Sequence, residues 1–161
     1  MYRAPVKDIR FVLDELIGTE SLRACPEFAD YSSETSEAVL DEAARFAETV
    51  LEPLCKSGDR QGAKWTPNGV TMPDGFKEAY QQFCENGWPA LRSSPEFGGQ
   101  GVPIVLGTAV EELWASSNLA FKLCPMLTQG AIEAISHFAT PEQKELYLPK
   151  MVSGEWTGTM N

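Results

Sequence analysis

The spacing of the apolar residues is the feature that most constrains the fold of this chain. Apolar side chains recur at intervals of three and four along nearly the whole sequence, and no stretch before Trp156 alternates with period two. Intervals of three and four gather side chains on one face of a helix, whereas strands require alternation. The chain has 161 residues, 43% of them hydrophobic, which suffices for one buried core. The sequence therefore predicts an all-α domain.

The helical pattern and its interruptions divide the chain into segments. Helices are predicted over residues 6–17, 33–54, 73–87, 103–114, 118–130 and 131–138, and a last, short one from Thr140 to near Pro149 or Met151. Thr140 and Gln143 form a capping-box pattern at its start. Pro125 is expected to kink or divide its helix, because proline lacks the backbone N–H. Residues 18–32 are predicted to be a connector, and residues 56–72 a long loop in which Trp65 needs burial.

The last eight residues, "GEWTGTMN", differ from the rest of the chain. Trp156, Thr157, Thr159 and Met160 are strand-favouring residue types, and glycines punctuate them. Chain termini are ordinarily polar and frayed. We therefore expect residues 155–161 to begin a strand, and the protein to continue beyond it.

Charge limits the partners that this chain can bind. Thirteen basic and 23 acidic residues give a net charge of −10. This charge argues against binding to nucleic acid, whose phosphates attract basic surfaces. A phosphate-bearing cofactor would need cations from another part of the protein. No stretch approaches the roughly 20 apolar residues of a membrane span. The N-terminus lacks the apolar region of a secretory signal. We expect a cytoplasmic protein that binds neither nucleic acid nor membrane.

The four cysteines are widely spaced. Cys25, Cys55, Cys84 and Cys124 form no C-x-x-C pair, which favours buried or half-buried thiols over two disulfides. A zinc site is disfavoured further, because ligands normally come in close pairs and the chain has one histidine. We expect no metal.

Three motifs that suggest chemistry have simpler interpretations. The loop Gly98-Gly99-Gln100-Gly101 follows no predicted strand and lacks a phosphate-binding lysine, which favours a structural turn. His137 is the single histidine, and a position on a helix surface is favoured over a catalytic one. Glu111 and Glu112 point about 100° apart on a helix. One is expected to face solvent and the other to accept a hydrogen bond in the core.

One segment has a different character. About one face of the helix over residues 118–130 carries Leu123, Met126, Leu127 and Gly130. This face combines the adaptable thioether of methionine with two aliphatic side chains and with the space left by glycine, which has no side chain. Such a face suits the wall of an apolar tunnel, and it also suits ordinary core packing, which the pattern alone favours. The residues considered so far define no self-sufficient active site.

The order of the motifs resembles the flavin-dependent acyl-CoA dehydrogenases. The resemblance rests on Pro95-Glu96-Phe97-Gly98-Gly99-Gln100-Gly101, on the glutamate-bearing helix around Glu111, and on "TPEQKELYLPKMVSGEWTGTMN" from Thr140 onward. Tyr2 to Leu16 resembles the N-terminal extension of a bacterial subgroup that includes 3-methylmercaptopropionyl-CoA dehydrogenases. The implied organisation is an extension helix and connector over 1–32, a helical N-terminal domain over 33–154, and the start of a β domain over 155–161.

The resemblance implies an activity for a longer protein. In this family an acyl-CoA thioester loses a proton and a hydride to give the trans-2-enoyl-CoA, with FAD as hydride acceptor and an electron-transferring flavoprotein as the next acceptor. The catalytic base is implied to lie in a C-terminal domain outside this chain. Leu123, Met126, Leu127 and Gly130 would line the acyl tunnel, and Met160 and Asn161 would approach the flavin.

The same resemblance sets further expectations. The full-length enzyme is expected to be a homo-oligomer, while the 161-residue chain alone is expected to be inactive and not to retain FAD. Two other functional classes stay open. One is a free-standing helical interaction module, and the other is a relative such as an acyl-CoA oxidase or an alkylation-response flavoprotein.

Overall fold

The computed structural model describes residues 1–159, except the side chain of Glu20, and Met160 and Asn161 lie outside this description. The described part is mainly helical and contains one two-stranded sheet, which confirms the all-α prediction. Its α-helices are α1 (Val6–Phe11), α2 (Ser33–Phe46), α3 (Glu52–Gln61), α4 (Phe76–Glu85), α5 (Ile104–Phe138) and α6 (Pro141–Val152). The π-helical turns are η1 (Val12–Ile17) and η4 (Ala47–Leu51), and the 3-10 turns are η2 (Thr19–Ala24), η3 (Pro26–Phe28), η5 (Trp88–Ala90) and η6 (Pro95–Phe97).

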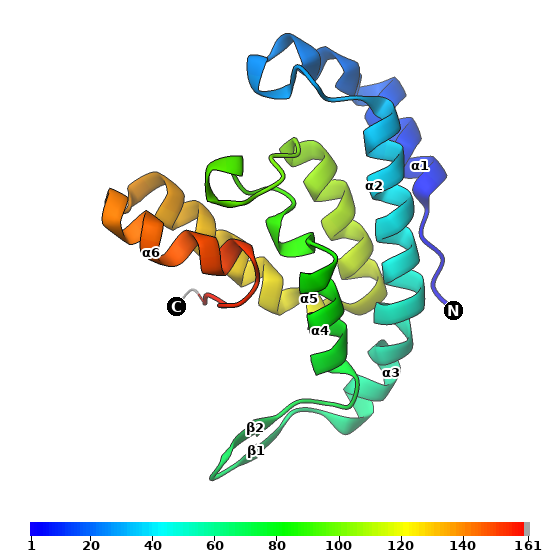
Figure 1. Cartoon of the computed structure of the whole chain (residues 1–161). Helices are drawn as coiled ribbons and strands as arrows, with labels where there is room; N and C mark the ends of the chain where they lie inside the picture. The colour runs from blue at the N-terminus through cyan, green and yellow to red at the C-terminus, as the bar shows by residue number, and fades with distance from the viewer. Residues whose placement is uncertain (160–161) are drawn as a thin grey trace.

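The helices pack around one main core. In Figure 1, α2 and α3 form a long column on one side of the molecule, with α1 beside α2 and with α4 and the first half of α5 facing the column. The second half of α5 returns beside α6 and carries the chain away from the column. An aromatic cluster holds the centre, where the ring centroids of Trp88 and Trp114 lie 5.1 Å apart and those of Phe46 and Trp114 lie 5.4 Å apart. Edge-to-face pairs of this kind add to the burial of the rings.

The N-terminal helix packs against the domain through its apolar face. Ile9 and Leu13 are buried, and the backbone N–H of Ala4 donates to Glu48 Oε1 at 2.8 Å. Gly18 ends the helix in the left-handed conformation, with φ at 71°. The extension is therefore part of the packed structure.

The second predicted helix is longer than expected. Helical structure continues from Ser33 through η4 to Gln61, so the prediction that it ends near residue 54 is wrong. Gly58, which falls in the predicted loop over residues 56–72, lies inside α3 and is buried against the Phe76 ring. A Cβ atom at position 58 would lie 2.5 Å from Phe76 Cε2, so this glycine provides room for close packing.

Residues 64–71 form a hairpin that the sequence analysis missed. Strands β1 (Lys64–Thr66) and β2 (Gly69–Thr71) pair antiparallel, with Trp65 opposite Val70. The two-residue connection Pro67-Asn68 is short enough for a tight hairpin turn. The hairpin extends from the body of the molecule in Figure 1, and Trp65 is 76% exposed, so the prediction that Trp65 is buried is wrong.

The bend in α5 lies at Asn118 and not at Pro125 as predicted. Asn118 is the residue of α5 with non-helical backbone angles, φ −157° and ψ 87°, and the helix continues through Pro125. The Asn118 side chain accepts the Phe121 N–H at 3.1 Å and donates to the Leu51 carbonyl at 3.0 Å. Asn118 therefore caps the second half of α5 and fixes the bend to η4.

The last helix begins as predicted, whereas the segment after it does not form the predicted strand. Thr140 and Gln143 make both hydrogen bonds of the capping box. No strand forms over residues 155–159, because no neighbouring strand lies beside them in the described part of the chain.

None of the helices in the described part combines the length and the apolar character that a membrane crossing requires.

Candidate functional site

A small cavity lies where the two halves of α5 approach α4 and the η5 turn. Its volume is about 40 Å³, which is room for roughly one to three water molecules. The apolar walls come from the aromatic core and from α5, and the polar groups come from the edges. The lining comprises Tyr80, Phe83, Trp88, Pro89, Leu91, Arg92, Gly107, Val110, Glu111, Trp114, Lys122, Pro125, Met126, Thr128, Gln129 and Ile132.

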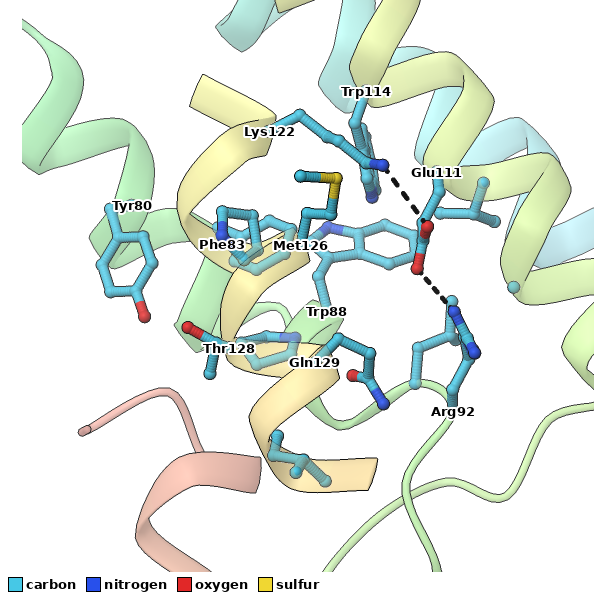
Figure 2. A pocket seen from close by; sticks show the side chains of 16 residues that line it. Tyr80, Phe83, Trp88, Arg92, Glu111, Trp114, Lys122, Met126, Thr128 and Gln129 are labelled. Carbon is cyan, nitrogen blue, oxygen red and sulfur yellow. Dashed lines mark hydrogen bonds and ion pairs between the residues drawn. The ribbon is translucent and has the colours of Figure 1, made fainter. Parts of the chain in front are cut away.

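A group of charges closes one end of this cavity. Figure 2 shows the Glu111 carboxylate between the Arg92 guanidinium group and the Lys122 ammonium group. Arg92 Nη1 donates to Glu111 Oε1 at 2.7 Å, and Lys122 Nζ lies 3.5 Å from Glu111 Oε2. All three side chains are largely buried. Glu112 is exposed, so Glu111 is the member of the pair that accepts hydrogen bonds from within the fold, as predicted for one of the two.

The four predicted tunnel residues do not all lie at this cavity. Met126 lines the cavity and is 38% exposed, while Leu123 is 47% exposed and faces away from the packed core. Leu127 and Gly130 are half-buried. Their role in a tunnel stays a prediction.

An exposed apolar face on the second half of α5 includes two of these residues. Leu119, Leu123 and Met126 follow one another at helical intervals of four and three, and each is exposed; we call these three residues the outer α5 face. Leu119 was not among the predicted residues, although its spacing from Leu123 was visible in the sequence. Arg92 and Lys122 were not predicted either, because no local sequence pattern indicates their contacts.

The segment after α6 is fixed to α4 and α5. Tyr80 donates its hydroxyl proton to the Gly154 carbonyl at 3.1 Å, and the N–H of Gly158 donates to Thr128 Oγ1 at 3.2 Å. A Cβ atom at Gly158 would lie 2.6 Å from the Ala131 Cβ, so the backbone runs close against α5. The predicted flavin-edge residues Met160 and Asn161 follow this anchored segment and lie outside the described residues.

The thiols and the histidine provide no reactive centre. Cys25, Cys55 and Cys124 are exposed, so the prediction of buried or half-buried thiols holds for Cys84 alone. Burial raises the pKa of the Cys84 thiol, and burial also raises the pKa of the neighbouring Tyr80 hydroxyl.

His137 is exposed on α5 with Nε2 3.6 Å from Glu133 Oε2, as expected for a surface histidine. No cluster of three or more side chains suited to a metal ion occurs within residues 1–159.

Comparison with known proteins identifies the family. The family model for the acyl-CoA dehydrogenase N-terminal domain matches residues 33–155. The chain belongs to this family, through its N-terminal domain.

Two curated relatives match nearly the whole chain. The 3-methylmercaptopropionyl-CoA dehydrogenase of Ruegeria pomeroyi is 39% identical over 160 residues, which cover 99% of this chain and 27% of the relative. A butyryl-CoA dehydrogenase of Syntrophomonas wolfei is 33% identical over 163 residues, which cover 99% of this chain and 27% of that relative. The chain thus spans about 27% of the length of these relatives.

A solved structure shows the same fold. A chain in the structure of the electron transferring flavoprotein of Acidaminococcus fermentans aligns with a TM-score of 0.62 and 20% identity, over 79% of this chain and 31% of that one. At this identity the likeness shows the fold alone.

Proposed function

We propose that this chain is the N-terminal helical part of an FAD-dependent acyl-CoA dehydrogenase. The family match over residues 33–155 carries the proposal. Relatives that align with nearly the whole chain are named for dehydrogenation of 3-methylmercaptopropionyl-CoA, butyryl-CoA and linear acyl-CoA thioesters, which supports an acyl-CoA thioester as the substrate class. The proposed product is the trans-2-enoyl-CoA.

The outer α5 face is the part of this chain that we assign to the acyl chain. Leu119, Leu123 and Met126 offer an exposed apolar strip on a helix held by Asn118, and Leu127 and Gly130 lie beside it. An apolar surface of this kind excludes water from an acyl chain and attracts it by burial. The thioether of Met126 adapts to acyl groups of different shapes. A second domain of the longer protein would complete the tunnel.

The described residues do not fit FAD by themselves. The cavity beside Met126 holds only about 40 Å³. The larger groove between β2, α4 and α5 has a mainly apolar lining that includes the carboxylates Asp74 and Glu78, and Lys77 is its single cation. A flavin pyrophosphate needs cations or helix N-termini. We propose that other parts of the enzyme hold FAD, which accepts the hydride there, and that Met160 and Asn161 approach its ring.

The remaining partners follow from the same proposal. The electron acceptor is proposed to be an electron-transferring flavoprotein, and the complete enzyme a cytoplasmic homo-oligomer. Because the net charge of this chain is −10, we propose that the phosphates of CoA meet cations outside it. No described residue is assigned a catalytic role, since the base is proposed to lie in another domain.

The coding region of the gene tests this proposal directly. We expect the reading frame to run several hundred codons beyond Asn161 and to encode a Thr-Glu-Pro motif at once. A stop codon directly after Asn161 would instead favour a free-standing helical module. The purified 161-residue chain is expected to remain colourless after dialysis against FAD, and a yellow protein with stoichiometric flavin would contradict our assignment of the flavin site.

A further inference from the structure

The glycine loop fixes the position of one arginine. The loop folds back so that the N–H groups of Gln100, Gly101 and Val102 donate to the carbonyls of Ala90, Ser93 and Leu91 at 2.9 to 3.1 Å. Gly99 lies against the Ser93 carbonyl, where a Cβ atom has no room. These contacts hold the backbone on both sides of Arg92. The loop is the structural turn that the sequence favoured, and its effect is to orient Arg92.

Arg92 contacts both halves of α5. Its aliphatic stem lies on Gly107 of the first half, where any larger residue would displace it. Nη1 donates to Glu111 of the first half at 2.7 Å, and Nη2 lies 3.9 Å from Glu133 Oε1 of the second half. In a straight helix, residues 111 and 133 would lie roughly 33 Å apart. One guanidinium group therefore spans a bend that brings these carboxylates together.

Lys122 adds a second connection between the halves. Its Nζ lies 3.5 Å from Glu111 Oε2, although residues 111 and 122 would lie roughly 16 Å apart in a straight helix. Glu133 also accepts a hydrogen bond from Gln129 at 3.4 Å and faces His137. These side chains form a network across the bend, beside Met126 of the outer α5 face, which lines the same cavity as Arg92, Glu111 and Lys122.

We propose that Arg92 is a positioning residue that sets the angle between the two halves of α5 and so places the outer α5 face. The non-helical backbone at Asn118 leaves this angle to be fixed by contacts on either side of the bend. The planar guanidinium group presents its N–H donors in a rigid fork, so it holds two carboxylates in fixed directions, whereas an ammonium group lacks this fixed geometry. The consequence for an acyl chain rests on the proposed function, whereas the geometric role does not.

The angle can be measured in the full 161-residue chain by double electron–electron resonance. Nitroxide labels on unnatural amino acids at Thr108 and Ala134, both exposed, report on the two halves without involving the native cysteines. We expect one narrow distance distribution, centred below the roughly 39 Å of a straight helix. Arg92→Met should broaden it and shift it to longer distances. Arg92→Lys should restore it in part, because the ammonium group reaches Glu111 but not Glu133 as well.

Two further variants complete the test. Arg45→Met is the matched control, because Arg45 is exposed on α2 and pairs with Glu42 of the same helix, and it should leave the distribution unchanged. Glu133→Gln removes one ion pair with little change of shape and should broaden the distribution even if Arg92→Met does not fold. A distance distribution like that of the wild type in folded Arg92→Met would overturn the proposal. If Arg92→Met does not fold, wild-type distributions in both the Glu133→Gln variant and the Arg92→Lys variant would overturn it. No substrate enters the measurement, so a failure of the proposed function leaves this result unaffected.

Discussion

Replacement of Asn118 by alanine should reveal how much of the fold depends on the bend in α5. The asparagine is fully buried, and alanine removes both of its hydrogen bonds. Loss of the cap at Phe121 costs about 1 kcal/mol. Leaving the Leu51 carbonyl buried without its donor costs about 1–3 kcal/mol more. The free energy of unfolding should therefore fall by about 2–4 kcal/mol, and Tm by roughly 4–16 °C.

Urea unfolding followed by far-ultraviolet circular dichroism measures this change. Asn68→Ala is a matched control, because Asn68 is exposed in the hairpin turn and its replacement should change stability by no more than about 0.5 kcal/mol. Asn118→Asp keeps the capping oxygen, but it removes the donor to Leu51 and places a buried carboxylate beside that carbonyl, so it should destabilise the fold at least as much. A loss below about 1 kcal/mol for Asn118→Ala would refute the assignment of the bend to this residue.

Three other perturbations have defined outcomes. Deletion of residues 1–20 should lower Tm, because it removes buried side chains from the α2 interface, and an unchanged melting curve would show that the extension is not docked. Met126→Ala should cost nearer 1 kcal/mol than the ~2–5 kcal/mol expected for fully buried Leu113→Ala, and equal losses would place Met126 in solid core. Burial raises the pKa of Cys84, so iodoacetamide at pH 8 should alkylate exposed Cys25 much faster, and equal rates by mass spectrometry would contradict the burial of Cys84.

The helices were predictable because their signals are local. Apolar residues at intervals of three and four specify a helix face. Thr140 and Gln143, only three residues apart, specify the capping box at the start of the last helix. The hairpin also had a local signal in Asn68-Gly69, which was missed because each strand is only three residues long. Trp65 was expected to be buried on the basis of its size, but the hairpin carries it away from the core.

The bend and the charge network were not predictable from local patterns. Proline is the usual cause of a helix break, yet Pro125 continues its helix while Asn118 is stabilised by a carbonyl 67 positions earlier in the sequence. The contacts of Arg92 are likewise long-range, at 19 positions to Glu111 and 41 to Glu133. Such contacts depend on how helices meet in space. The apolar face around Leu123 and Met126 was visible in the sequence, but its exposure was not.

The most direct test of the proposed function is the response of the complete gene product to acyl-CoA. The protein should be purified as a flavoprotein, and anaerobic addition of butyryl-CoA or 3-methylmercaptopropionyl-CoA should bleach the flavin absorbance with formation of the corresponding enoyl-CoA. Free CoA should have no such effect. A product that retains no flavin, or a flavin that no acyl-CoA thioester reduces, would contradict the assignment of this domain to an acyl-CoA dehydrogenase.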